Sequence, residues 1–156
     1  MPSFMVHELL EGHAFIAGLS DAQIKKLASL ACEVSFEENE FVLHAGQQSR
    51  HFYLMLTGSV CVEARGRGYT VTVQAVGPGE TIGWSAFLEH HDTLFQVRAR
   101  ERSTALCLEG VALNAMLRED PELAAELLRR VLEVVAGRVQ ATETVLGEMI
   151  GVRLRS

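Results

Sequence analysis

The segment Gly77-Pro-Gly-Glu-Thr-Ile-Gly-Trp-Ser-Ala-Phe-Leu-Glu89 indicates the architecture of this chain more clearly than any other part of it. Its glycines predict a turn, a short strand end and then a short helical turn, and a further strand is expected over residues 94–100. Glycines let a backbone approach a ligand closely, and successive N–H groups at the start of a helical turn converge on an anion. The segment therefore predicts a cradle of backbone amides between two strands.

The residues around this segment predict a roll of short strands. Runs of β-branched and aromatic residues alternate with turns such as Thr57-Gly-Ser59 and Arg65-Gly-Arg-Gly68. The runs cover residues 33–36, 41–44, 52–56, 60–64, 69–76, 95–100 and 104–108. In residues 69–76 apolar and polar side chains alternate, starting with Tyr69, so we expect the apolar set to face inward. Many short strands at regular spacing are typical of a sandwich or roll.

Helices are expected on both sides of the roll. Residues 3–19 carry apolar side chains at the spacing of one or two short amphipathic helices. Ser20 with Gln23 three positions later predicts a capped helix that runs through Leu30. Residues 111–118 predict a short helix, and Pro121 opens a long helix that reaches about residue 150.

These elements predict a mainly β fold with flanking helices. We expect a β-roll (jelly roll) with N-terminal helices and a long C-terminal dimerisation helix, in one domain over residues 1–156. Within it, helices occupy residues 1–31, the roll occupies residues 32–109 with the glycine-rich segment at 77–99, and helices occupy residues 110–152.

The long helix carries an apolar stripe whose average period is close to 3.5 residues, the repeat of a coiled coil. The stripe comprises Leu128, Leu132, Val135, Val139, Thr142, Leu146 and Met149. Its first two turns are expected to pack on the roll of the same chain. Beyond Ala136 the helix is expected to outrun the roll, so that a partner helix covers the stripe. The pattern predicts a homodimer, and a regulatory protein partner is the other occupant considered.

Composition limits the functions to consider. The 156 residues have a formal net charge of -6, which argues against direct nucleic-acid binding because that affinity comes from clustered Lys and Arg. Only Arg129-Arg130 and the segment from Arg153 to Arg155 look clustered. Three widely spaced cysteines without Cys-x-x-Cys spacing are expected to be buried free thiols in a reducing cytoplasm. No apolar run approaches the roughly 18 residues that span a membrane.

The order of elements, together with four short motifs, resembles the cyclic-nucleotide-binding domain of the catabolite-activator (Crp-Fnr) superfamily. The motifs are Phe15-Ile-Ala-Gly-Leu-Ser20, Phe52-Tyr-Leu-Met-Leu-Thr-Gly-Ser-Val60, Gly77-Pro-Gly-Glu-Thr-Ile-Gly83 and Val97-Arg-Ala99. The resemblance implies a non-catalytic regulatory or sensor module whose ligand is cAMP, cGMP or another small molecule. It also implies a stand-alone form, because the roughly seventy residues of the helix-turn-helix domain found in related regulators have no counterpart in this sequence.

The resemblance implies a degenerate phosphate-binding cassette. Gly83 matches the family's glycine, but Trp84 stands where the ribose-binding Glu belongs, and Ser85-Ala86 begin the small helix. Thr93 stands where the phosphate-binding Arg belongs, and Leu94 replaces the hydroxyl residue after it. Losing that guanidinium removes a contact worth roughly 1.5–3 kcal/mol, so weak cyclic-nucleotide binding is expected.

One further position follows from the resemblance. Thr142 on the long helix falls where the family places a hydroxyl against the adenine across the dimer seam. The expected ligand-binding residues are therefore Gly83, Trp84, Ser85, Ala86, Thr93, Leu94 and Thr142.

Two hypotheses about the cassette remain open at this point. In the first, Trp84 stacks on a ligand and the cradle works as a sensor. In the second, Trp84, Leu94 and Phe95 fill the former pocket, and the chain is a ligand-free interaction or scaffold protein. The alternating pattern places Arg98 and Arg100 on the outer face of the roll, where we expect solvated side chains.

A third hypothesis is a metal-dependent cupin enzyme, suggested by His90-His91-Asp92 in a protein of short strands. Adjacent loop histidines point apart, and a third histidine at suitable spacing is missing, so a solvated loop tip is expected. The sequence offers no Ser-His-Asp order, nucleophile elbow or Walker-type loop. We therefore expect neither a catalytic residue nor a metal site.

Overall fold

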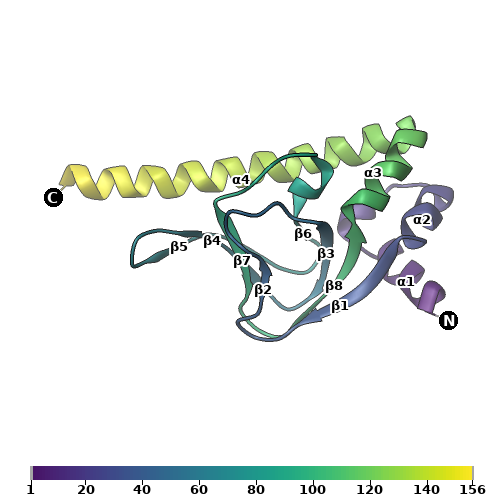
Figure 1. Ribbon diagram of the computed structural model, residues 1–156, viewed down its shortest axis with the longest axis horizontal. Helices are drawn as coiled ribbons and strands as arrows, with labels where there is room; N and C mark the ends of the chain where they lie inside the picture. Colours follow the sequence, from purple (N-terminus) through teal and green to yellow (C-terminus); the bar gives the residue numbers. More distant parts are fainter. Residues whose placement is uncertain (1, 156) are drawn as a thin grey trace.

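The computed structural model describes the backbone of residues 2–155 and the side chains of residues 5–151. Two four-stranded antiparallel sheets form a roll, with short helices at one end and a long helix across it (Figure 1). The predicted fold class is confirmed. The strands are β1 Ala31–Phe36, β2 Phe41–Leu43, β3 His51–Thr57, β4 Val60–Arg65, β5 Thr70–Val76, β6 Thr81–Ile82, β7 Phe95–Ala99 and β8 Ser103–Glu109. The helices are α1 Pro2–Glu11, η1 Ala14–Ile16, α2 Asp21–Ala28, η2 Trp84–Phe87, α3 Gly110–Glu119 and α4 Pro121–Arg155.

The strand order explains how distant segments meet. One sheet has the order β1-β8-β3-β6 and the other has the order β2-β7-β4-β5, so most neighbours are far apart in sequence. The short strand β6, which the sequence pattern did not separate from the cassette, pairs with β3 through Tyr53 and Leu54. This pairing places η2, directly after β6, at the edge of the first sheet.

Two apolar clusters hold the fold together, one on each face of the first sheet. In β3, Phe52 and Leu54 face the helices, whereas Met55 faces the inside of the roll, and all three are at most 1% exposed. Residues of both faces are buried because helices cover one side and the second sheet covers the other. Fully burying a side chain of this size contributes roughly 1.5–3 kcal/mol.

The inward and outward alternation predicted for residues 69–76 holds from Thr70 to Val73 and fails on either side of that segment. Tyr69 is 57% exposed, and Val76 rather than Ala75 is buried. A register shift between β4 residues Val62 and Glu63 leaves an extra residue in β5. A β-bulge of this kind moves the following side chains to the opposite face.

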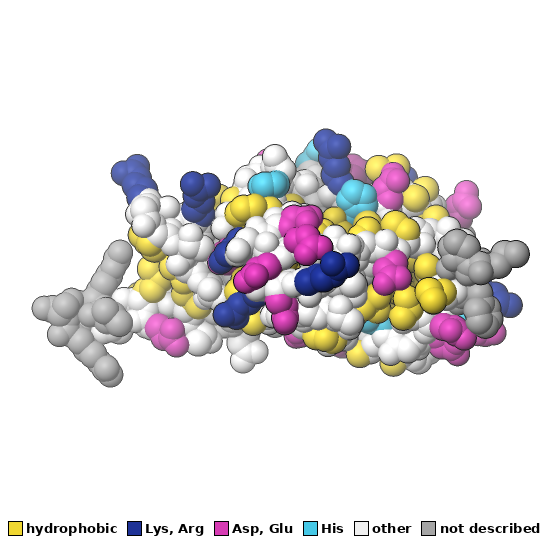
Figure 2. Space-filling view, turned by 90° about the horizontal axis from the view of Figure 1, so that it is seen from below, with side chains coloured by type: hydrophobic (Ala, Val, Ile, Leu, Met, Phe, Trp, Pro, Cys, Tyr) yellow, Lys and Arg dark blue, Asp and Glu magenta, His cyan; other side chains and the backbone are white. Residues whose placement is uncertain are grey.

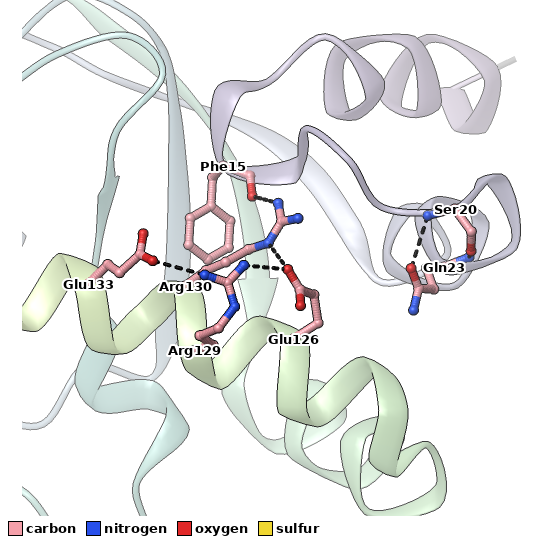
Figure 3. A network of polar contacts seen from close by, with 7 residues as sticks. All are labelled: Phe15, Ser20, Gln23, Glu126, Arg129, Arg130 and Glu133. Atoms are coloured by element: carbon pink, nitrogen blue, oxygen red, sulfur yellow. Dashed lines mark hydrogen bonds and ion pairs between the residues drawn. The ribbon is translucent and has the colours of Figure 1, made fainter.

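The helix start at Ser20 forms as predicted. Its hydroxyl accepts a hydrogen bond from the Gln23 N–H at 3.2 Å, and the Ser20 N–H donates to the Gln23 side-chain oxygen at 2.9 Å (Figure 3). This capping box satisfies two donors that the first turn would otherwise leave free.

The long helix α4 is fixed to the N-terminal segment by an arginine. The Arg130 guanidinium donates to the carbonyl oxygen of Phe15 in η1 and to Glu126 one turn earlier, while Arg129 pairs with Glu126 and Glu133 (Figure 3). The pair Arg129-Arg130 is therefore engaged with carboxylates.

The expected packing of the first turns of the stripe is wrong. Leu123, Leu127 and Val131 face the core, whereas the stripe residues Leu128 and Leu132 are 48% and 67% exposed. The buried face lies beside the stripe because the helix turns a different side toward the sheet. The C-terminal part of α4 extends past β5 in Figure 1, as the sequence led us to expect.

Charges of both signs share the face of the molecule that lies away from α4. Figure 2 shows Lys and Arg side chains interspersed with Asp and Glu side chains there. One exposed pair is Arg102 with Glu37, at 3.1 Å. Among the described helices, none is long and apolar enough to cross a membrane.

His13 is a buried histidine that the sequence pattern did not single out. Its Nδ1 accepts a hydrogen bond from the Phe15 N–H at 3.1 Å, and its Nε2 lies 2.9 Å from the Met55 carbonyl oxygen. The neutral ring with a proton on Nε2 satisfies both contacts. Burial lowers the pKa of His13 below its usual 6.5.

Because the folded state prefers neutral His13, its contribution to stability is complete above about pH 6.5 and is lost as the pH falls further. We predict that the free energy of unfolding decreases below this pH, by at most about 1.4 kcal/mol per pH unit from this group. Chemical denaturation at pH 5.5 to 8 measures it. His13→Gln should flatten the profile, and the exposed His90→Gln should not; an unchanged slope in His13→Gln contradicts the assignment.

Candidate functional site

The cassette begins at Gly83, which connects β6 to η2. Its φ of +85° lies in the left-handed region, and a Cβ there would collide with the carbonyl oxygen of His51 and lie 2.8 Å from the Ser49 hydroxyl. The position needs glycine for both reasons. The tight connection sets η2 directly against the end of β3.

The loop before β3 holds η2 in place. The Ser49 N–H donates to the Ser85 hydroxyl at 3.0 Å, and the Gln48 side-chain amide donates to the Ser85 carbonyl oxygen at 3.0 Å. Ser85 is 3% exposed. Within the turn, the Ala86 N–H donates to the Gly83 carbonyl oxygen at 3.0 Å. The cassette backbone is therefore rigidly supported, and the Ala86 amide is already engaged.

A small cavity lies beneath the cassette. It is bounded by four predicted site residues, Gly83, Trp84, Ser85 and Thr93, and by one residue of the long helix, Arg138. The rest of its wall is apolar and comes from Leu43, Phe95 and Val97. Its volume of about 20 Å³ is close to the roughly 10–15 Å³ that one water molecule needs. The structure therefore shows a nearly closed site.

Three predicted residues lie outside this cavity. Leu94 is 84% exposed, so its side chain neither lines the cavity nor fills it. Ala86 is buried against the helical core, and its amide is used within the turn. Thr142 is half-buried, and its hydroxyl donates to the Arg138 carbonyl oxygen at 2.8 Å, one turn back along α4.

The important residue that the sequence analysis missed is Arg138. It is 7% exposed, and its Nε–H donates to the Gln74 side-chain oxygen at 2.6 Å. Burial lowers the pKa of Arg138, although an arginine keeps its proton at neutral pH. The signal was available: Arg138 follows Leu127, Val131 and Val135 at spacings of four, four and three, on the face of α4 that packs on the core.

Comparison with known proteins agrees with this geometry. Residues 33–120 match the family model described as the cyclic nucleotide-binding domain. The chain belongs to the cyclic nucleotide-binding domain family. No curated protein sequence matches it significantly.

Solved structures share this family's fold. A cyclic nucleotide-binding domain from Methylobacillus flagellatus KT is 21% identical with a TM-score of 0.78, covering 94% of this chain and 85% of its own. The N-terminal domain of a transcriptional regulator from Streptomyces coelicolor A3(2) is 27% identical with a TM-score of 0.65, covering 88% and 94%.

A third solved structure is the regulatory subunit of a cAMP-independent protein kinase A from Trypanosoma brucei. It is 21% identical with a TM-score of 0.70, and the match covers 94% of this chain and 53% of the subunit. That structure is a variant with a glutamate changed to alanine, a threonine to arginine and a valine to alanine, and it is bound to cAMP in one site.

Within this cyclic nucleotide-binding domain, Arg98 keeps 36% of its side chain exposed. It also forms an ion pair that was not predicted, a two-point contact with Glu63 with Nε–Oε1 at 3.1 Å and Nη2–Oε2 at 2.9 Å. Glu63 is 3% exposed, and the hydrogen bonds from Arg98 lower its pKa despite burial. The Gln96 amide donates to the same carboxylate at 3.1 Å. The bulge in β4 and β5 turns Glu63 toward β7, so Arg98 is committed and does not reach the cassette.

The domain also has an open groove on the other side of η2, with a volume of about 1120 Å³. His90 and Asp92 line it, while the His91 ring lies 5.0 Å from the Trp84 ring. Among the described residues, no three His, Cys, Asp or Glu side chains are grouped so as to hold a metal ion. The described residues therefore provide no set of metal ligands that would support the cupin hypothesis.

We predict that Gly83→Ala lowers the free energy of unfolding by about 3 kcal/mol, because a left-handed φ and a backbone collision both oppose a methyl group. Urea denaturation measures this change. Gly68→Ala is the matched control: its φ is +74°, but a Cβ there would have nothing within 4 Å, so it should cost only about 1–2 kcal/mol. Equal losses in the two variants would contradict the close approach at Gly83.

Proposed function

We propose that this chain is a non-catalytic regulatory module of the cyclic nucleotide-binding type, in which a small ligand at the cassette changes the position of α4. The family is typically regulatory, and the described residues offer no catalytic arrangement. The observation that carries the proposal is that Arg138 of α4 forms part of the cassette cavity, together with Gly83, Trp84 and Ser85. An occupant of the cavity must therefore contact the helix. Two packings of α4 with different ligand affinity are sufficient for a population shift.

The output of this module is proposed to be a homodimer through α4. Five stripe residues, namely Leu128, Leu132, Val139, Leu146 and Met149, are between 38% and 67% exposed in the single chain. Together with Val135 and Thr142 they alternate at spacings of four and three residues over three heptads, so the same stripe on a second copy fits it as a parallel coiled coil. A regulatory protein with a similar helix is the alternative occupant.

The ligand is proposed to be a small molecule that is not bound tightly as a cyclic nucleotide. Thr93 offers a hydroxyl where the family has a guanidinium, and that hydroxyl already accepts a hydrogen bond from the Phe95 N–H at 3.1 Å. The Trypanosoma regulatory subunit supports this idea, since its cAMP-bound variant carries a threonine-to-arginine change. Titration of cAMP and cGMP, followed through the single tryptophan Trp84, tests the nucleotide version; lack of response to either at millimolar concentration eliminates it.

The closed cavity also supports a second candidate function. Trp84 packs against the helical core, and the remaining space is about 20 Å³. A ligand-free scaffold with a filled pocket would show the same small cavity. In that case Phe95 and Trp84 would fill the pocket, and the exposed Leu94 would not. This candidate predicts that α4 docks a partner regardless of small molecules, whereas the sensor predicts a dimer whose stability depends on a ligand.

We predict that Thr93→Arg tightens cAMP binding roughly 10- to 150-fold, because a charge-assisted contact to phosphate contributes roughly 1.5–3 kcal/mol. Isothermal titration calorimetry measures the dissociation constant. The control Thr70→Arg adds the same charge on the exposed start of β5 and should leave the affinity unchanged. No gain in Thr93→Arg would show that this position does not face a bound phosphate.

We predict that Leu132→Glu weakens self-association at least about tenfold, or about 1.4 kcal/mol, since two carboxylates would then meet in the seam. Sedimentation equilibrium measures the monomer–dimer constant. Gln140→Glu adds the same charge on the same helix one residue away from the stripe, and it should associate like the wild type. A monomeric wild type, or equal behaviour of both variants, argues against the homodimer.

A further inference from the structure

Arg138 is a buried cation that forms no ion pair with any of the described carboxylates. Of its five N–H donors, the one with a hydrogen-bond partner among the described residues is Nε–H, bonded to the uncharged Gln74. None of the described carboxylates lies within the 4.0 Å of an ion pair. Glu80 is exposed and influences the guanidinium only through its field. Buried charges are normally paired, because removing an unpaired charge from water costs several kcal/mol.

Arg138 is also one of the residues that line the cassette cavity. Every other lining residue is uncharged, and two of them, Ser85 and Thr93, carry hydroxyl groups. The cavity is thus a small space whose wall contains one positively charged residue and two residues with hydroxyl groups. This combination favours an oxyanion, because guanidinium and hydroxyl donors suit carboxylate and phosphate oxygens.

We propose that Arg138 takes over the charge of the missing cassette arginine, so that the site binds a small oxyanion such as inorganic phosphate or the phosphate group of a small metabolite. The inference deepens the proposed function and rests on it, because it names the chemistry of the ligand at the same site. The cation reaches the cavity from α4 instead of from the strand after the cassette. A ligand that pairs with it is therefore attached directly to the helix that forms the output.

Trp84 restricts the size of the ligand. With about 20 Å³ available, there is room for one water molecule but not for a nucleoside. An oxyanion of four or five heavy atoms enters only if Trp84 or α4 moves outward by a small amount. Binding is thus coupled to a displacement, and the single tryptophan reports it. The site prefers a compact anion to a complete cyclic nucleotide.

The test is thermal unfolding of the whole chain with increasing inorganic phosphate, at constant ionic strength set with sodium chloride. Ligand binding to the folded state raises Tm along a saturating curve. We expect that curve for wild type, its loss in Arg138→Gln, and a weaker version in Arg138→Lys. The control Arg67→Gln changes an exposed arginine in the turn between β4 and β5, and it should keep the full response.

In the absence of phosphate, the direction in which Arg138→Gln shifts Tm distinguishes a ligand-binding role of Arg138 from a structural one. If Arg138 is an unneutralised charge kept for a ligand, Arg138→Gln should unfold at the same Tm or a higher one, since replacing a buried charge often stabilises a protein. If Arg138 serves mainly to fix α4 through Gln74, the variant should unfold several degrees lower. A lower Tm together with an unchanged phosphate response overturns the inference.

Three further probes distinguish the possible sources of the anion. They also show whether a negative result contradicts the oxyanion inference or the proposed function. Acetate tests a carboxylate, glycerol 3-phosphate tests a phosphate carried by a metabolite, and guanosine tests a ligand without an anion. A response to guanosine alone, or to cAMP without one to phosphate, overturns the oxyanion inference and leaves the regulatory function standing. A phosphate response that depends on Arg138 without any change in the dimer constant supports the inference and contradicts the proposed output.

Discussion

The buried charge of Arg138, which has no carboxylate partner among the described residues, is the constraint that connects the parts of this molecule. The guanidinium comes from α4, and the cavity wall comes from the cassette and from β2 and β7. Desolvation makes the guanidinium unfavourable there without a counter-ion. The same partial desolvation strengthens an interaction with an anion, because charges interact more strongly where the effective dielectric constant is low. The cassette and α4 therefore meet at the guanidinium of Arg138.

The rest of the fold supplies the rigidity that such a site requires. Gly83 allows η2 to lie directly against β3, and Ser49 and Gln48 fix η2 by hydrogen bonds. About two turns before Arg138 in α4, Arg130 holds the helix to η1 through the Phe15 carbonyl oxygen (Figure 3). The N-terminal half of α4 is thus anchored, and the half after Arg138 is mostly exposed. Under the proposed function, a small displacement at the cavity would be transmitted to the part of α4 that carries the outer stripe.

Much of this architecture could be read from the sequence, because its signals are local. Glycine-bounded strands predicted the roll, and Ser20 with Gln23 predicted the helix start that forms. The errors arise where tertiary pairing overrides a local period. A bulge between β4 and β5 reversed the faces near Val76 and turned Glu63 toward Arg98. The position of Leu94 on the surface depends on how the loop after η2 turns, which no short pattern specifies.

The candidate site was predicted in part. Glycine at position 83 and its neighbours Trp84 and Ser85 belong to one continuous segment, so motif spacing located them. Arg138 comes from an element more than fifty residues away, and its contribution depends on the rotation of α4 about its axis. The apolar stripe indicated the outer face of the helix, whereas Arg138 lies on the inner face.

Hydrogen exchange by mass spectrometry, with and without inorganic phosphate, tests the coupling between cavity and helix most directly. If Arg138 joins them, amide protection should change in two segments together, residues 81–87 at the cassette and residues 134–146 of α4. The change should be absent in Arg138→Gln. Protection that changes at the cassette while α4 stays the same would contradict the account.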